Sequence, residues 1–141
     1  MRIWRKAHEN AIVADFFTLL SMPNVATNVV DIEKNAAHIE EQLKARGFET
    51  RLLTAEAGTP PSIFAEMKVP GAKRTVIFYA HYDGQPIGQN GWLSSPFQPS
   101  MRTALPEAKV VDWQNSTGSL DPERTCGSET CGTGSRSMQG F

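Results

Sequence analysis

The rhythm of apolar and polar residues changes several times along the first part of the chain. From residue 2 to about residue 20 the apolar residues recur at helical spacing, and Pro23 ends that pattern at or before Met22. We therefore expect one amphipathic helix, with this apolar face: Trp4, Ala7, Ala11, Ile12, Phe16, Leu19 and Leu20.

A second helix is predicted from about Val30 to Arg46. Asp31 suits its first turn, where a negative charge is attracted by the helix dipole, and Gly47 is the expected left-handed stop. The predicted apolar stripe consists of Ile32, Ala36, Ile39 and Leu43. The sequence thus places two helices before any strand.

Two short strands follow the helices. Residues 48–54 alternate only in part, which is typical of a strand near an edge, and residues 58–61 read as a turn. Residues 62–69 form the second expected strand, with Ile63, Ala65 and Met67 on one face. The short connections suggest that a hairpin forms the edge of the sheet.

The run from Arg74 to Ala80 is apolar and β-branched without interruption. Such a run predicts a strand buried on both faces, and together with the two helices it favours the α/β class. Ligands of open α/β sheets bind outside the carboxyl ends of the strands. His81 and Asp83 stand at that end, so they are the candidate site residues.

The spacing of His81 and Asp83 has a chemical meaning. Side chains two residues apart on an extended chain point the same way, so the carboxylate can reach the imidazole. A metal-binding imidazole usually donates its other N–H to a carboxylate, and the same pairing serves a general base. A third interpretation is a histidine at a strand end that bonds its neighbour and has no function.

Composition narrows the classes of function. The chain has 141 residues, 40% of them hydrophobic and 21% charged, which fits one globular domain with a core. The net charge of −1 gives no reason to expect binding to nucleic acid or to an anionic membrane. We see no membrane-spanning run and no signal peptide, and the two cysteines do not form a disulfide framework. We expect a cytoplasmic protein.

The stretch Phe78–Pro86, followed by Trp92, Pro96 and Phe97, resembles the di-zinc metallopeptidase family M-twenty. That family includes aminoacylases, dipeptidases, glutamate carboxypeptidases and succinyl-diaminopimelate desuccinylases. Its signature has an apolar strand, then His-x-Asp, a Gly/Pro loop and Trp-x-x-x-Pro-Phe. The residues around Met22–Val25 and Ala45–Glu49 also look like segments of the family.

The resemblance implies that residues 1–123 are the N-terminal portion of an α/β/α zinc-exopeptidase catalytic domain. His81 would be a ligand of one of two zinc ions, and Asp83 would be the active-site carboxylate that orients His81. Trp92 and Phe97 would be structural. The implied reaction is hydrolysis of a small peptide or an N-acyl amino acid, and the full-length family implies a possible homodimer.

The sequence departs from the family after Glu123. The segments that would supply the bridging Asp, the Glu base and further ligands do not follow, and residues 124–141 are rich in Gly, Ser, Thr and Arg. We expect a disordered tail that follows a lost reading frame near Glu123 or another truncation, and a chain that is inactive by itself. Cys126 and Cys131 match no zinc or redox spacing.

Two other functions are alternatives to a truncated hydrolase. The first is a non-enzymatic binding or dimerising module that reuses the same fold. The second is a different His-Asp hydrolase, but neither Ser94 nor Ser95 lies in a Gly-x-Ser-x-Gly elbow. The module is therefore the main alternative.

Overall fold

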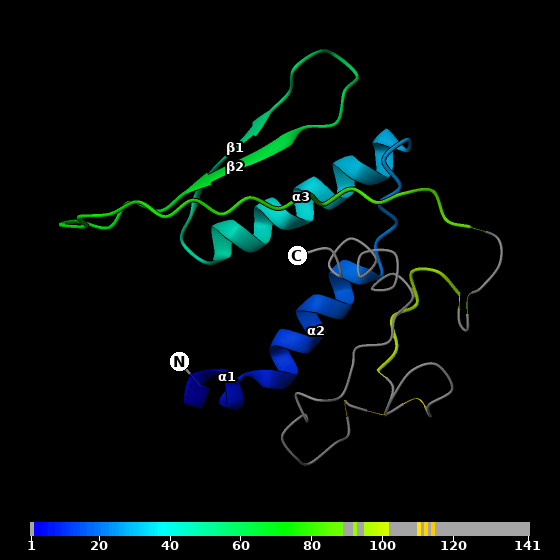
Figure 1. Cartoon of the computed structure of the whole chain (residues 1–141), viewed down its shortest axis with the longest axis horizontal. Coiled ribbons are helices and arrows are strands. Elements are labelled where there is room, and N and C mark those ends of the chain that lie inside the picture. The colour runs from blue at the N-terminus through cyan, green and yellow to red at the C-terminus, as the bar shows by residue number, and fades with distance from the viewer. Residues whose placement is uncertain are drawn as a thin grey trace. The chain divides into compact units, whose positions relative to one another are not determined.

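The structure is a computed structural model that describes residues 2–88, 92, 95–101, 110, 112 and 114. It combines helices with a small two-stranded antiparallel sheet, which confirms a loosely α/β chain. The elements, in chain order, are α1 (Arg2–Ala7), α2 (Glu9–Leu20), α3 (Val29–Ala45), β1 (Glu49–Leu53) and β2 (Ser62–Glu66) (Figure 1).

The chain divides into two compact units. Met1–Met22 and Ile87–Phe141 belong to the first unit, and Pro23–Pro86 forms the second. Helices α1 and α2 lie in the first unit, whereas α3, β1 and β2 lie in the second. No helix in the described part of the chain has the length and apolar character needed to cross a bilayer. The expected tail, residues 124–141, and its two cysteines lie outside the described residues.

The first predicted helix is wrong in one respect, because it is divided at His8. The backbone of His8 is non-helical, with φ −115° and ψ 12°. Its ring stacks on Trp4 with centroids 4.3 Å apart, and its Nδ1 lies 2.8 Å from the Trp4 carbonyl oxygen. The backbone hydrogen bonds from His8 N–H to the Trp4 oxygen (3.1 Å) and from Ile12 N–H to the His8 oxygen (3.0 Å) continue through this position, so the division is a local distortion.

The buried face of α2 also differs from the predicted one. Trp4 on α1 is 60% exposed and Phe16 on α2 is 40% exposed, whereas Val13 and Phe17 pack against the buried Met101. Two residues of the predicted face, Leu19 and Leu20, are half-buried as expected. The predicted stripe followed helical spacing through Ile12 and Phe16 and left out Val13 and Phe17. The face of α2 that packs against another described residue is therefore shifted by one residue toward the C-terminus from the predicted face.

Helix α3 matches its prediction closely. Ile32 and Ala36 are each 1% exposed, and the remaining stripe residues are half-buried. The Asn28 side chain caps the helix by accepting a hydrogen bond of 3.2 Å from the backbone N–H of Asp31. Gly47 has φ +86°, which is the left-handed conformation expected at the stop.

Asn35 is a polar residue inside the apolar face of α3. It is only 2% exposed, and its Nδ2 donates to the carbonyl oxygens of Pro23 at 2.7 Å and Asp31 at 2.8 Å. The first bond ties the loop before α3 onto the helix. A buried amide is tolerated because both of its donors are used.

The predicted hairpin is confirmed. Strands β1 and β2 pair antiparallel, with Leu52 opposite Ile63, and α3 packs against both. Thr50 on β1 donates its hydroxyl to Glu40 Oε1 on α3 at 2.8 Å. That bond, together with the nearby Lys44 ammonium, lowers the pKa of the Glu40 carboxyl.

The predicted buried strand at Arg74–Ala80 is wrong as to burial and pairing. The segment is extended (Figure 1), but it belongs to no sheet, and Ile77, Phe78 and Tyr79 are 87%, 91% and 92% exposed. Strands β1 and β2 pair only with each other, so no described strand covers this segment. The apolar run thus indicated an extended chain correctly, while its burial depends on partners that the described residues do not provide.

Replacing Asn35 by alanine should weaken the fold of the second unit. The change removes two hydrogen bonds and leaves the Pro23 carbonyl without its donor, so we expect a loss of about 1–3 kcal/mol. Urea unfolding followed by circular dichroism measures the loss. Asn10→Ala, an exposed helical asparagine, is the matched control and should change stability by less than about 0.5 kcal/mol. Equal effects of the two variants would contradict a structural role for Asn35.

Candidate functional site

The candidate site is the short extended stretch that contains His81 and Asp83. Nδ1 of His81 lies 3.2 Å from Asp83 Oδ1 and 3.0 Å from the Asp83 backbone oxygen. This confirms that the carboxylate reaches the ring. Because both neighbours of Nδ1 accept hydrogen bonds, Nδ1 carries the proton and Nε2 keeps its lone pair. Nε2 is therefore the atom that can bind a metal or take up a proton.

Both side chains of this pair are open to solvent. The His81 side chain is 68% exposed and the Asp83 side chain is 49% exposed. At such exposure water weakens the attraction between the two groups, so the pair orients the imidazole without strongly stabilising the fold. The open position leaves Nε2 accessible to an incoming group.

The loop before α3 holds this stretch in place. The Gly84 N–H donates to the Asn24 carbonyl oxygen at 2.7 Å, and the Ala26 N–H donates to the Gly84 carbonyl oxygen at 2.9 Å. These bonds form an isolated parallel bridge between Val25 and Gly84. The backbone directly after Asp83 is thereby held against the loop before α3.

Asn24 adds a side-chain contact to that bridge. Its Nδ2 donates to the Tyr82 carbonyl oxygen at 3.0 Å, across 58 residues of sequence. Its Oδ1 lies only 2.8 Å from the point where a β-carbon on Gly84 would stand. Glycine is therefore required at position 84 as long as the Asn24 amide keeps this orientation.

Tyr82 points to the opposite side from His81 and Asp83, as alternation along an extended chain requires. It is half-buried, and its hydroxyl donates to the Pro61 carbonyl oxygen just before β2. Burial, and secondarily the Asp83 carboxylate, raise the pKa of Tyr82 above its ordinary value of 10.0. Tyr82 thus anchors the site to the hairpin.

The described residues do not complete a zinc site. Zinc takes four ligands, or three and a water molecule. No group of three or more His, Cys, Asp or Glu side chains with the geometry for a metal occurs among the described residues. They supply one imidazole and the carboxylate that holds it.

The other residues of the family-like signature lie in the first unit. Trp92 donates its indole N–H to the Gly88 carbonyl oxygen at 2.7 Å. Pro96 and Phe97 are half-buried in a turn where the Gln98 N–H donates to the Ser95 oxygen at 3.1 Å. Phe97 has φ +60°, which is uncommon for a residue with a side chain. These contacts are local and fit a structural role.

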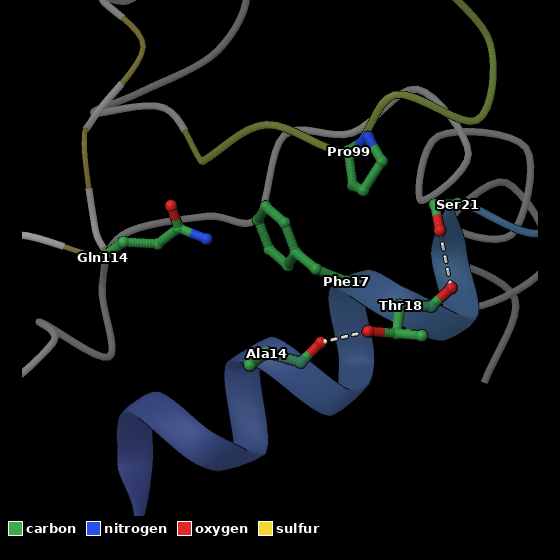
Figure 2. Close-up of a pocket in the computed structure, with 6 residues that line it drawn as sticks. All are labelled: Ala14, Phe17, Thr18, Ser21, Pro99 and Gln114. Atoms are coloured by element: carbon green, nitrogen blue, oxygen red, sulfur yellow. Dashed lines mark hydrogen bonds between the residues drawn. The ribbon is translucent and has the colours of Figure 1, made fainter.

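A shallow pocket of about 470 Å³ opens beside α2 in the first unit. Figure 2 shows that its two hydroxyls are already committed to the helix: Thr18 donates to the Ala14 oxygen at 3.0 Å, and Ser21 donates to the Thr18 oxygen at 2.8 Å. The described lining contains no acid, base or thiol, and consists of Ala14, Phe17, Thr18, Ser21, Pro99 and Gln114. Nothing in this lining supplies chemistry.

Sequence reasoning found His81 and Asp83 but missed the residues that hold them. Asn35 carried a usable signal, because it falls beside Ile32 and Ala36 on the apolar face of a predicted helix. Asn24 lies in the family-like stretch Met22–Val25, but its contact with Tyr82 could not be predicted from spacing, since the two residues are 58 positions apart.

Gly84→Ala should be coupled to Asn24. In the native chain the new methyl group displaces the Asn24 amide and removes its bond to Tyr82, which costs about 0.5–1.5 kcal/mol. In the Asn24→Ala background the same change should stabilise by about 0.4–1 kcal/mol through the unfolded chain. Urea unfolding of the four chains measures the coupling. Gly88→Ala, where a β-carbon meets nothing within 4 Å, is the control. If the stability changes caused by Gly84→Ala and Asn24→Ala simply add, the proposed contact between Asn24 and residue 84 is refuted.

The phenol of Tyr82 should titrate above pH 10.0 in the folded chain. Tyr79→Phe leaves it as the sole tyrosine, so ultraviolet absorbance follows it alone. Because the folded state binds this proton more tightly, the stability from Tyr82 is complete below about pH 10 and is lost as pH rises through the raised pKa. The free energy of unfolding, measured across that pH range, should fall as pH rises, and the Tyr79→Phe/Tyr82→Phe variant is the control that lacks the titrating phenol. A titration that is the same in denaturant would contradict the burial of this ring.

Comparisons of this chain with protein-family models, with curated protein sequences and with solved structures each return no match. No family membership is therefore shown. The chemistry of His81 and Asp83 rests on their own geometry.

Proposed function

We propose that residues 1–123 are the N-terminal portion of a metal-dependent hydrolase of peptide or amide bonds, with a partial α/β/α zinc-exopeptidase-like sheet. In this proposal His81 is a ligand of one zinc through Nε2. Asp83 is the carboxylate that holds His81. The substrate would be a small peptide or an N-acyl amino acid, and the location would be the cytoplasm.

The observation that carries the proposal is the paired geometry of Nδ1 with the two oxygens of Asp83. These contacts of 3.2 Å and 3.0 Å fix the tautomer in which Nε2 is a ligand, as in metal sites where a carboxylate supports an imidazole. The exposure of His81 leaves that nitrogen accessible. The His-x-Asp spacing and the later Trp and Pro-Phe positions agree with the family-like signature.

This chain by itself should not hydrolyse amides. In a complete site of this kind, paired metal ions polarise the carbonyl and lower the pKa of a bound water molecule. The described residues contribute one ligand and its orienting carboxylate, and no described cluster supplies the remaining ligands. What they do is present and orient the His81 imidazole.

The alternative function is a non-enzymatic binding or dimerising module. The exposure of Ile77, Phe78 and Tyr79 favours it, because large apolar patches on soluble proteins mark interaction surfaces. A module predicts a defined oligomer with a single sharp thermal transition. A hydrolase fragment predicts a broad transition and aggregation, which light scattering during heating would distinguish.

Zinc should bind at His81 in a manner that depends on Asp83. NMR of the three histidine rings during zinc titration should show the largest shift at His81, with His8 and His38 as internal references. Asp83→Asn should weaken zinc binding at His81 by about tenfold, because the orienting acceptor is lost. Glu56→Gln, another exposed carboxylate, is the matched control. Equal zinc shifts at all three rings would sink the ligand assignment.

The assignment to a longer hydrolase is tested on the nucleotide sequence. Reading all three frames beyond the Glu123 codon should reveal a Gly-x-x-Asp-Asp-Lys-like segment in another frame. If no frame encodes one, the hydrolase origin loses its main support. Amide hydrolysis by the purified chain with added zinc would separately contradict the proposed inactivity.

A further inference from the structure

The most exposed apolar stretch of the second unit is also a long stretch of backbone that pairs with no other described residue. Val76, Ile77, Phe78 and Tyr79 are between 70% and 92% exposed. No residue from 73 to 81 shares a backbone hydrogen bond with another described residue. An extended apolar segment with free N–H and C=O groups is a template for pairing with another strand.

The bridge at Gly84 determines which edge of the segment is available. In an extended chain the N–H and C=O of one residue point to the same edge, and those of the next residue point to the other. Gly84 turns both groups toward Asn24 and Ala26, and the Tyr82 carbonyl faces Asn24 as well. Even-numbered residues therefore face that loop, and odd-numbered residues from 73 to 83 present the opposite edge, which is open except that the Asp83 carbonyl oxygen also accepts from His81 Nδ1 at 3.0 Å.

We propose that this open edge pairs antiparallel with the same segment of a second copy of the chain, centred on Phe78. In this register Lys73 of one copy lies opposite Asp83 of the other, and Ile77 lies opposite Tyr79. These odd-numbered residues would exchange the backbone hydrogen bonds. The two Phe78 side chains would form the close, non-hydrogen-bonded pair on the dyad axis.

The distribution of charge along the segment favours a second copy of the chain as the partner, and favours antiparallel over parallel pairing. Lys73 and Arg74 precede the apolar run, and Asp83 follows it, all exposed. Antiparallel pairing centred on Phe78 brings a lysine opposite a carboxylate at both ends, whereas in-register parallel pairing would align like charges, which is unfavourable. Centring on Ile77 would instead set Lys73 against His81. Phe78 is therefore the centre that satisfies both the free edge and the charges.

Disulfide cross-linking tests the register on the full-length chain. Cys126 and Cys131 are first replaced by serine, and Phe78→Cys, Val76→Cys and Ala80→Cys are made in that background. Non-hydrogen-bonded antiparallel partners lie about 4.5 Å apart at Cα, within disulfide range. Phe78→Cys should cross-link with itself. Val76→Cys should cross-link only when mixed with Ala80→Cys.

Several outcomes of this experiment would overturn the proposal. They are a monomeric parent chain by sedimentation, efficient self-cross-linking of Val76→Cys, or a polydisperse aggregate whose cross-links ignore position. If the segment pairs only with a strand of an unrelated protein, the purified chain will be monomeric, and this result would contradict the proposed self-pairing. Because Phe78 is 91% exposed, its replacement should leave the circular dichroism spectrum unchanged. That spectrum is the control for folding.

Charge reversal tests the same register independently. Lys73→Glu alone and Asp83→Lys alone should each weaken the dimer by about tenfold, because each places like charges opposite one another at both ends. The double variant should recover most of the affinity of the parent. Lys68→Glu, a reversal outside the segment, is the matched control. No recovery in the double variant would refute the proposed partners. This dimer rests on the alternative function, the dimerising module, so its confirmation would favour the module over a hydrolase fragment. Neither experiment depends on zinc or on hydrolysis.

Discussion

The second unit depends on a relay of hydrogen bonds that begins inside helix α3. Buried Asn35 holds the carbonyl of Pro23, and the next residue, Asn24, bonds both Tyr82 and Gly84. A buried amide is costly unless its donors are satisfied, so the loop and helix must fit together. Because the loop is fixed, the extended stretch that is hydrogen-bonded to it, around Tyr82 and Gly84, is fixed too. The orientation of His81 is therefore set from a helix more than forty residues earlier in the sequence.

The same arrangement explains why the apolar run from Arg74 to Ala80 is not a core. A strand is buried by its neighbours in a sheet and by the layers above it, and not by its own composition. Among the described residues, the hydrogen bonds from the loop before α3 hold the extended segment at its carboxyl end, at residues 82 and 84. The preceding residues have no described strand beside them, because β1 and β2 pair only with each other.

Local patterns predicted the elements whose cause is local. The stripe of α3, its left-handed stop at Gly47 and the hairpin all follow from spacing and turn chemistry, and each is confirmed. The reach of Asp83 to His81 follows from alternation along an extended chain. What sequence could not supply was long-range: the Asn24 contact to Tyr82, the exposure of Phe78 and the partner of α2. Each depends on which segments meet, and a single sequence does not encode that in its periodicity.

The proposed site and the proposed interface share Asp83, and this sharing has a thermodynamic consequence. Its carboxylate faces His81 in the single chain, and in the paired register it also lies opposite Lys73 of the second copy. An exposed carboxylate cannot accept the His81 N–H and pair with the Lys73 ammonium at full strength at the same time. If both proposals hold, pairing of the chains weakens zinc binding at His81, and by reciprocity zinc binding weakens the pairing by the same factor. The backbone oxygen of Asp83, 3.0 Å from Nδ1, limits the size of this coupling because it keeps the imidazole tautomer in place.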